Sequence, residues 1–439
     1  MFINAKCQVF LLKMLYLHMR SIMKTKTLTA LLLCATAVGQ LAAFPVHAAQ
    51  QLTVWEDIRK SDGIKDAIRD FEKQYNVSVN LQEMPYAQQL EKLRLDGPAG
   101  IGPDVLVIPN DQLGGAVVQG LIAPLKLDQA VQDSFTEASM AAFRMNNQVY
   151  GLPKAVETLV LIYNKEQVNK PLASLQEWYD FSRRQQAQNS FGLLAKFDQI
   201  YYSWGAIGPM GGYIFGKNDK DPGKNDKGGL NPLDIGLNTP GAVEAVTLLR
   251  KFYADKLFPA GIIGDNGLNA IDSLFTEKKA AAVINGPWAF QPYEAAGIHY
   301  GVAPLPLLPD GKPMSSFLGV KGYVVSTWSK DNALAQRFID FINQPRYVKV
   351  RYQRTGEIPP QKSMIDDPLI KNDEKASAVA IQAARAVPMP GIPEMGEVWG
   401  PANAALELSM TGKQQPKAAL DNAVKQIKMQ VEAMQASNQ

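Results

Sequence analysis

The chain has 439 residues, of which 46% are hydrophobic, so it holds enough apolar surface for about two folded domains. Its formal net charge is +3 and its basic residues form no run, which gives no reason to expect binding to nucleic acid or to anionic lipid. With two cysteines and three histidines, the composition excludes a disulfide scaffold and a His-rich metal site.

The N-terminus has the pattern of an export signal. Lys24 and Lys26 precede an apolar run at 28–37 that is too short to span a membrane, and Val46-His47-Ala48 follows as a small-residue cleavage site. We therefore expect residues 1–48 to be a signal peptide that is cleaved after Ala48. Met23 would open a conventional signal peptide by itself, so the translation start stays open.

Removal of residues 1–48 changes the inventory of reactive groups. It leaves 40 basic against 42 acidic residues, a net charge near −2, and it removes Cys7 and Cys34. The mature chain then has no thiol nucleophile and no cysteine-ligated metal. Cys34 follows three leucines and not the small residues that precede a lipid-carrying cysteine, which favours a soluble exported protein. His299 is the one remaining histidine, and we expect it to pack beside an apolar strand.

The first part of the mature chain alternates strands and helices. The pattern predicts strands at 51–55, 77–81 and 104–108, with helices at 64–75 and 87–95 between them. The run at 104–108 is continuously apolar, as in a parallel sheet covered on both faces. Ligands of such sheets bind beyond the carboxyl ends of the strands. The polar and aromatic residues that follow the strands are Trp55, Glu56, Asp57, Arg59, Tyr86, Asn110 and Asp111.

Glu157 is the acid around which the sequence suggests a site. We assign it to the otherwise apolar strand of 159–163, inside which an ionised carboxylate costs several kcal/mol unless it is paired. We expect it to face a polar cleft that holds a ligand. The alternative is an edge-strand acid that faces water.

The second part of the chain repeats the alternation. Thr239-Pro240 resembles a helix cap before a helix at 242–252, and the buried strand 280–284 leads into Asn285-Gly-Pro-Trp288. The repeated Gly-Lys-Asn-Asp-Lys at 216–220 and 223–227 lacks the acid spacing of a calcium loop and is interpreted as a solvated loop.

The last part of the chain returns toward the first. A strand at 317–325 has the character of the Glu157 segment, and the C-terminus ends in a helix at 418–434. Several crossings between two halves indicate two lobes that close about a hinge.

The aromatic residues and acids are suited to a sugar. Stacking one pyranose on a ring removes about 40–60 Å² from water, worth roughly 1–1.5 kcal/mol. Micromolar binding needs about 8 kcal/mol, so carboxylate acceptors at about 1.5–3 kcal/mol each have to contribute as well. The alternative for each aromatic residue taken alone is packing in the core.

Five segments together resemble one family. They are Asp111-Gln-Leu-Gly-Gly, Gly151 to Glu157 with Ile162-Tyr-Asn-Lys165, Tyr201-Tyr-Ser-Trp204, Ile284 to Phe290, and Gly391-Ile-Pro-Glu-Met395 with Trp399. In this order they resemble the maltose/maltodextrin-binding proteins of ABC importers, within the extracellular solute-binding proteins.

The resemblance implies an α/β fold of the periplasmic-binding-protein type II, with two lobes joined by three hinge crossings around a ligand cleft. It places the crossings near Glu157, Phe317 and Asp367, with residues 49–155 and 320–366 in an N-terminal lobe and residues 158–317 and 368–439 in a C-terminal lobe. It implies a periplasmic monomer without catalytic activity, cofactor or metal. Its partners would be an oligosaccharide and the membrane permease subunits of an importer.

Carried over by position, Glu157 and Asp111 match acceptors of sugar hydroxyls. Tyr201, Trp288 and Trp399 match stacking rings. The complete set of candidate ligand-binding residues is Glu56, Asp57, Arg59, Tyr86, Asp111, Glu157, Tyr201, Tyr202, Trp204, Trp288, Phe290 and Trp399.

The chain also departs from the family's pattern. This chain has Ile108 where the maltose binders have Trp, Gln112 where they have Arg, Gly400 where they have Tyr, Asn403 where they have Arg, and Phe290 where they have a second Trp. These departures put simple maltose in doubt and favour a maltodextrin, a cyclodextrin or another larger oligosaccharide.

Two other functions remain open from the residues. An exported glycoside hydrolase needs two carboxylates, and Glu157 with Asp111 could supply them. A ferric-ion binder could use Tyr201 and Tyr202, although the neighbouring Trp204 argues against it.

Overall fold

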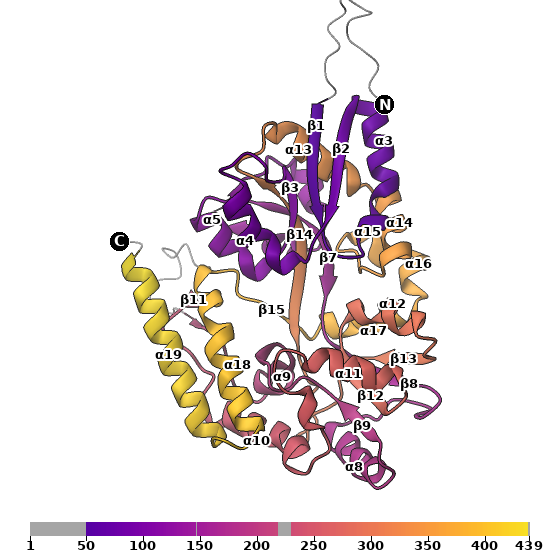
Figure 1. Ribbon diagram of the computed structural model, residues 1–439, viewed down its shortest axis with the longest axis vertical. Coiled ribbons are helices and arrows are strands. Elements are labelled where there is room, and N and C mark those ends of the chain that lie inside the picture. Colours follow the sequence, from indigo (N-terminus) through magenta and orange to yellow (C-terminus); the bar gives the residue numbers. More distant parts are fainter. Residues whose placement is uncertain (1–49, 146, 218–229, 438–439) are drawn as a thin grey trace, which may run out of the picture. The chain divides into compact units, whose positions relative to one another are not determined.

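The computed structural model describes residues 50–145, 147–217 and 230–437 (Figure 1). The predicted signal peptide with its cleavage site at Ala48 lies outside the described residues, as does most of the repeated Gly-Lys-Asn-Asp-Lys stretch. Within the described ranges, no helix is long and apolar enough to cross a membrane.

The first β-sheet has seven strands in the described part of the chain, and its central order is β15-β14-β3-β1-β2. β1 and β3 are parallel, whereas β14 runs antiparallel to β3, β4 and β7. Its strands are β1 (Gln50–Glu56), β2 (Val77–Glu83), β3 (Val105–Pro109), β4 (Ile122–Ala123), β7 (Gly151–Glu157), β14 (Phe317–Ser326) and β15 (Val387–Pro388). The predicted strand and helix alternation of this region is confirmed.

Helices cover the two faces of this sheet with separate apolar cores. On one face, α3 (Lys65–Tyr75) packs against α13 (Asn332–Ile342), and Phe71 meets Phe338 edge to face at 5.2 Å. On the other face, α4 (Tyr86–Asp96) buries Leu90 and Leu93 against β3. The continuous apolar run of β3 is therefore buried on both sides, as its sequence predicts.

The second β-sheet has the order β13-β8-β12-β9. Ser174 and Glu177 form a reciprocal capping box on α8, and Thr239 caps α10 with Pro240 in the first turn, as predicted. The elements of this half are β8 (Val160–Asn164), β9 (Phe191–Leu194), β12 (Ala280–Asn285), β13 (Tyr300–Ala303), α8 (Leu175–Gln186), α9 (Ile200–Ile207), α10 (Pro240–Ala254), α11 (Gly267–Thr276), α12 (Phe290–Ala295), α17 (Glu374–Ala383), α18 (Gly396–Met410) and α19 (Pro416–Ser437).

Shorter elements complete the fold. They are α5 (Leu113–Val118), α6 (Gln129–Asp133), α7 (Glu137–Ala141), α14 (Pro345–Thr355), α15 (Lys362–Ile365), α16 (Pro368–Lys371), the strand pairs β5 (Arg144–Met145) with β6 (Gln148–Val149) and β10 (Gly216–Lys217) with β11 (Leu230–Asn231), and the 3₁₀ turns η1 (Ser61–Gly63), η2 (Asn110–Gln112), η3 (Ala260–Ile262), η4 (Pro287–Ala289) and η5 (Pro393–Met395).

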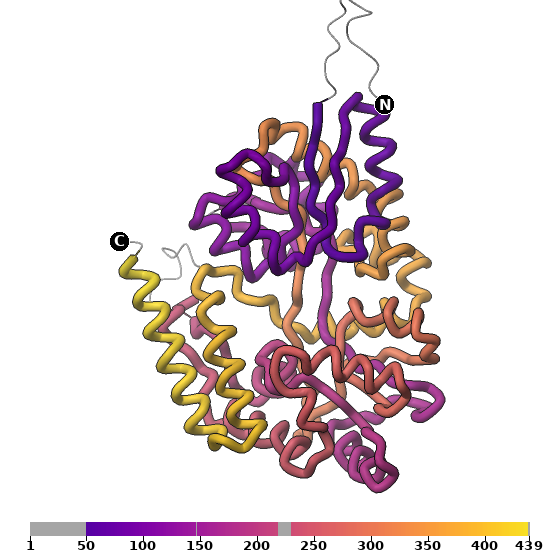
Figure 2. The backbone as a smooth tube through the Cα atoms, in the orientation of Figure 1, coloured from indigo at the N-terminus to yellow at the C-terminus, as the bar shows by residue number. Residues whose placement is uncertain are grey.

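The chain passes between the two sheets along β7 and β14, which pair with each other (Figure 2). β7 ends at Glu157, and β8 of the second sheet begins three residues later at Val160. Glu157 therefore ends β7 and does not belong to the strand at 159–163, which corrects its expected place inside that strand. The lobe boundaries themselves stay a prediction.

The expectation for His299 is wrong. Its side chain is exposed, and its backbone carbonyl accepts from the Lys165 N–H at 2.9 Å. It follows the loop before β13 and does not enter the apolar core.

Candidate binding cleft

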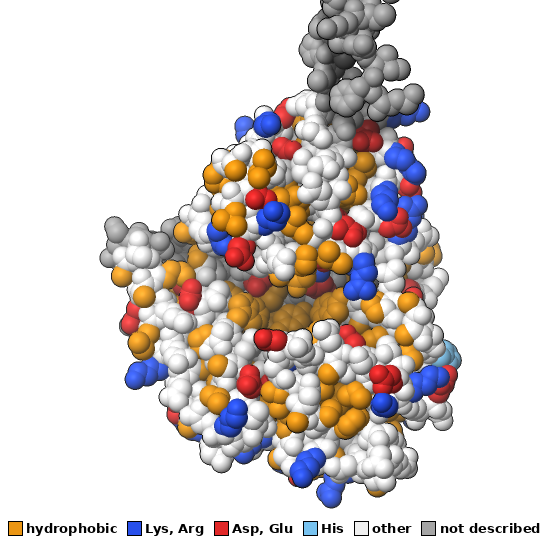
Figure 3. Space-filling model, viewed as in Figure 1, with side chains coloured by type: hydrophobic (Ala, Val, Ile, Leu, Met, Phe, Trp, Pro, Cys, Tyr) orange, Lys and Arg blue, Asp and Glu red, His pale blue; other side chains and the backbone are white. Residues whose placement is uncertain are grey.

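A cavity of about 620 Å³ lies between residues of the first sheet and residues of the second, in the size range of small-molecule sites (Figure 3). Side chains from both halves of the sequence meet there. The lining residues are Asp57, Ile58, Arg59, Lys60, Tyr86, Ala87, Pro109, Asp111, Gln112, Glu157, Gln199, Tyr201, Tyr202, Leu268, Trp288, Gln291, Pro292, Lys321, Met389 and Trp399.

The parallel strands β1 and β3 bring one wall together. β1 ends at Glu56 and is followed by Asp57, and β3 ends at Pro109 and is followed by the turn η2 that carries Asp111. Their carboxyl ends share one edge of the sheet, which is where ligands of such folds bind. Asn110 stays buried and holds this edge to other segments, because its amide donates to the Met389 carbonyl and its oxygen accepts from the Val320 N–H.

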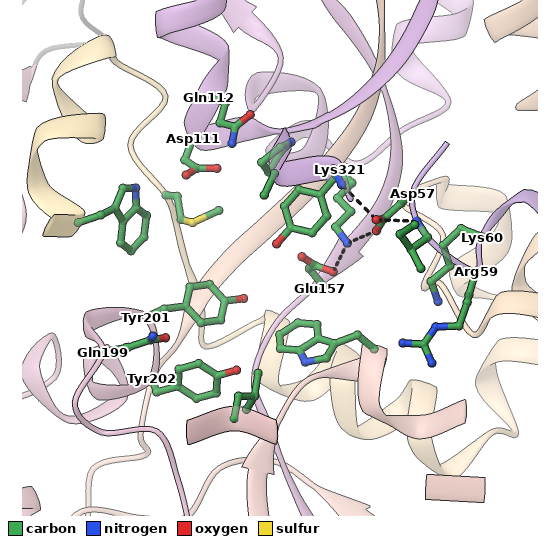
Figure 4. Close-up of a pocket in the computed structure, with 18 of the residues that line it drawn as sticks. Asp57, Arg59, Lys60, Asp111, Gln112, Glu157, Gln199, Tyr201, Tyr202 and Lys321 are labelled. Atoms are coloured by element: carbon green, nitrogen blue, oxygen red, sulfur yellow. Dashed lines mark hydrogen bonds and ion pairs between the residues drawn. The ribbon is translucent and has the colours of Figure 1, made fainter. Parts of the chain in front are cut away.

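The pairing of β7 with β14 forms the floor of the cavity. Glu157 lies opposite Gly319, and Lys321 is two residues further along β14, so the two charged side chains are diagonal neighbours on one face. The Lys321 Nζ lies 3.4 Å from Glu157 Oε2 and 3.2 Å from Asp57 Oδ2 (Figure 4). The same ammonium lies 4.2 Å from the centre of the Tyr86 ring.

This cluster supplies the pairing that a carboxylate at Glu157 needs. Burial alone would lower the pKa of Lys321, but the carboxylates of Glu157 and Asp57 outweigh it and raise that pKa above its usual value. Lys321 is therefore a cation, and Glu157 is not an uncompensated charge in the cleft.

Asp111 on the neighbouring wall is in a different environment. Burial raises its pKa to about 6, although the backbone N–H groups of Asp111 and Gln112 and the Trp399 indole oppose the shift. Tyr86 is shifted in the same sense, since burial and then Glu157 raise its pKa to about 12. Asp111 is thus largely removed from water, so a hydrogen bond that a ligand donates to its carboxylate is strong.

Aromatic rings form the opposing wall. Tyr201 and Tyr202 lie in the first turn of α9, which begins at Ile200, and the Ile200 N–H donates to Asn403 Oδ1 at 2.8 Å. Trp288 lies in η4, 6.3 Å from the Tyr201 ring, and its indole packs over Gly286, where a Cβ would come within 2.2 Å of the ring. Trp399 comes from α18.

The structure brings nine of the twelve candidate residues to this cavity. They are Asp57, Arg59, Tyr86, Asp111, Glu157, Tyr201, Tyr202, Trp288 and Trp399.

Three candidates lie elsewhere, which corrects their assignment to the site. Glu56 is fully buried and accepts from Lys154 and from the Tyr323 hydroxyl, both at 2.7 Å. Trp204, one turn beyond Tyr201, stacks on Phe317 at 4.7 Å in the core. Phe290 is buried and stacks on Tyr300. Each of these side chains is committed to packing or to an ion pair.

Sequence reasoning missed several lining residues, of which Lys321 is the most informative. It is the one charged residue in the otherwise apolar or small strand β14, so the argument used for Glu157 would also have found it. Lys60, Gln199, Gln291 and Met389 carried no comparable signal.

The residues that depart from the family's pattern also have defined positions. Ile108 is fully buried in β3, Gln112 lines the cavity, and the Asn403 side chain is used by α9. Gly400 does not line this cavity, and a Cβ there would meet no atom within 4 Å. Among the described residues, no group of three His, Cys, Asp or Glu side chains is placed to hold a metal ion.

Known proteins share both the sequence and the fold. A galactooligosaccharide-binding protein of Bacillus subtilis is 48% identical over 419 residues, which cover 93% of this chain and 98% of the relative. The maltodextrin-binding protein MdxE of the same organism is 35% identical over 384 residues, covering 86% and 89%.

Solved structures agree with these relatives. A cyclo/maltodextrin-binding protein complexed with maltotetraose has a TM-score of 0.77 and 37% identity, and covers 88% of this chain and 98% of its own. MalX from Streptococcus pneumoniae in complex with maltopentaose has a TM-score of 0.79 and 31% identity, covering 86% and 100%. The fold is thus of the periplasmic-binding-protein type II, as expected.

The family model for bacterial extracellular solute-binding proteins matches residues 66–378, which is more than half of the chain. Together with the relatives above, this match shows that the chain belongs to the bacterial extracellular solute-binding proteins.

Proposed function

We propose that the protein is the extracytoplasmic substrate-binding component of an ABC sugar importer and that its cleft binds a neutral oligosaccharide. The observation that carries this proposal is the composition of the cleft: Tyr201, Trp288 and Trp399 supply flat apolar faces, while Asp111 and Glu157 supply hydrogen-bond acceptors. Sugar rings present apolar C–H faces and hydroxyl edges, so both kinds of group are needed to reach micromolar affinity.

The charges in the cleft support a neutral ligand. Lys321 is balanced by Asp57 and Glu157, with which it forms ion pairs at 3.2 and 3.4 Å. An anionic or cationic sugar would meet a charge of its own sign in this cluster, at a cost that neutral hydroxyls avoid.

For the sugar itself we propose a galacto-oligosaccharide first and a maltodextrin or cyclodextrin second. The 48% identical relative carries the name galactooligosaccharide-binding protein, whereas MdxE at 35% is named for maltodextrin. The departures at Ile108, Gln112, Gly400 and Asn403 put simple maltose in doubt but do not rank these larger sugars among themselves.

Binding is proposed to close the two lobes about the segments near Glu157, Phe317 and Asp367. The lobes would comprise residues 49–155 with 320–366 and residues 158–317 with 368–439. A ligand can shift the balance between the open and closed states only by binding one of them more tightly. A sugar that contacts side chains from both walls would bind the closed state more tightly. The closed monomer would then deliver the sugar to the permease subunits from outside the membrane, after cleavage near Ala48.

The proposal is tested by calorimetric titration of the mature protein with β-1,4-galactotriose, maltotriose, maltohexaose and β-cyclodextrin. We expect saturable binding of one sugar per protein, strongest for galactotriose, with quenching or a shift of tryptophan fluorescence. The sugar should be recovered intact. Heat from none of these sugars would refute the ligand class, and release of new reducing ends would favour a hydrolase that uses Asp111 and Glu157.

A further inference from the structure

The cation in the cleft floor, Lys321, has hydrogen-bonding capacity that the protein does not use. An ammonium has three donors. Asp57 Oδ2 accepts one of them at 3.2 Å, while the distance of 3.4 Å to Glu157 Oε2 is long for a hydrogen bond. The side chain is 7% exposed and lines the cavity, so its remaining donors lie within reach of a ligand.

Asp57, in contrast, is already satisfied by the protein. Its Oδ1 accepts from the backbone N–H of Ile58 at 2.9 Å and from that of Tyr86 at 3.2 Å, and its Oδ2 accepts from Lys321. This carboxylate holds Lys321 in place and has little capacity left for sugar hydroxyls. Asp57 is therefore a positioning residue, although it lines the cavity.

Glu157 complements Lys321. Within the described part of the chain its oxygens accept no hydrogen bond shorter than the 3.4 Å ion pair. Its neighbour across the strand is Gly319, so no opposing side chain covers it. In Figure 4 the head groups of Lys321 and Glu157 lie side by side among the residues that line the pocket.

We propose that Lys321 and Glu157 form a donor and acceptor pair that recognises two neighbouring gauche hydroxyls on one pyranose ring, which makes Lys321 a specificity-determining residue. The oxygens of two such hydroxyls have a separation similar to that of the ammonium and the carboxylate. One hydroxyl accepts from Lys321 and its neighbour donates to Glu157. Adjacent ring hydroxyls of gluco- and galactopyranose chairs are all gauche, so the pair selects which two ring positions are bound and not one hexose over the other. This inference rests on the proposed oligosaccharide function and names the sugar feature that the site reads.

The test combines changes in the protein with changes in the sugar. The probe is β-1,4-galactotriose, or maltotriose if only that sugar binds, together with the monodeoxy analogues of the same trisaccharide. For the wild-type protein, two analogues that lack neighbouring hydroxyls on one ring should each bind about 10- to 100-fold more weakly than the parent, the range for hydrogen bonds to charged groups.

Lys321→Met should weaken the parent trisaccharide by a similar factor and should no longer discriminate against one of the two analogues. Lys154→Met is the matched control, because Lys154 also pairs with two carboxylates, Glu56 and Glu357, but does not line the cavity. That variant is expected to be less stable, but where circular dichroism shows it folded it should keep the wild-type profile of analogue affinities. A merely structural role of Lys321 would weaken all analogues equally.

Lys321→Arg provides a second test in case the Met variant does not fold. It keeps the charge for Asp57 and Glu157 but moves the donors, so the analogue profile should change while folding is retained. The inference is overturned if the wild-type protein binds the trisaccharide yet no neighbouring pair of hydroxyls matters, or if the Met or Arg variant retains the full wild-type profile. Absence of binding to every sugar would instead overturn the proposed function.

Discussion

Replacement of Trp288 by alanine tests whether the aromatic wall binds the ligand. The indole is partly exposed in the cleft and packs on Gly286, so its free face is available for a sugar ring. A stacked pyranose covers about 40–60 Å² of apolar surface, worth roughly 1–1.5 kcal/mol at about 25 cal/mol per Å². Trp288→Ala should therefore weaken sugar binding by about 5- to 13-fold in a calorimetric titration.

A second variant moves the same ring without removing it. Gly286 has an extended backbone with φ −114°, which alanine adopts freely, but a Cβ would come 2.2 Å from the Trp288 ring. Gly286→Ala should displace the indole and weaken binding by a similar factor.

The control is Trp328→Ala, since Trp328 is 37% exposed and does not line the cavity. Its affinity for sugar should equal that of the wild type. If Trp288→Ala lowers the free energy of unfolding by several kcal/mol and binds sugar normally while folded, Trp288 belongs to the core and the assignment of the wall is refuted.

Three further predictions concern charged groups. Glu157→Gln should reduce sugar affinity by about 1.5–3 kcal/mol with little change in stability, measured by titration and urea unfolding, because Lys321 keeps its second carboxylate partner; an unchanged affinity would contradict its role as acceptor. The pKa of Asp111 is raised to about 6, so the folded protein favours the protonated carboxyl. Its contribution to folding stability is therefore present below about pH 4 and is lost as the pH rises through 6, by at most about 1.4 kcal/mol per pH unit. Sugar affinity should show the opposite trend and fall as the pH drops below 6, because the acceptor carboxylate becomes protonated. Asp111→Asn should remove both dependences, and their persistence in denaturation and binding profiles would assign them to another group. Lys154→Met should lower the free energy of unfolding by about 3–5 kcal/mol, because Glu56 and Glu357 lose the buried ammonium with which both pair. A loss below about 1 kcal/mol in urea unfolding would show that these two ion pairs are not needed for stability.

Local sequence patterns were sufficient for most elements of the fold. The apolar run of β3, the amphipathic face of α3 and the cap at Thr239 each depend on neighbouring residues, so periodicity and capping chemistry identify them. The residues after the parallel strands, Asp57 and Asp111, were found in the same way.

Local sequence patterns do not predict which distant residues come together in the folded protein. Tyr201, Trp288 and Trp399 lie on three separate elements, and their placement in one wall rested on resemblance to a known family. Trp204 shows the limit of that method. It is only three residues from Tyr201, yet the helix directs its ring onto Phe317 in the core.

A charged residue in an apolar strand indicates a ligand site, and this criterion applies to more residues than Glu157. Glu157 was noticed because it was assigned to an apolar strand, but Lys321 is the residue that does lie inside one, in β14. The two are diagonal neighbours across paired strands, a relation that requires the register of β7 and β14 and cannot be obtained from either strand alone.

A crystal structure of the mature protein with bound β-1,4-galactotriose, or with the sugar of highest affinity in the titrations, tests the central claim most directly. The account predicts that the sugar lies intact between the rings of Tyr201, Trp288 and Trp399 and the carboxylates of Asp111 and Glu157. A sugar bound outside this cleft, or one that contacts the rings while neither carboxylate lies within hydrogen-bonding distance of a hydroxyl, would contradict it.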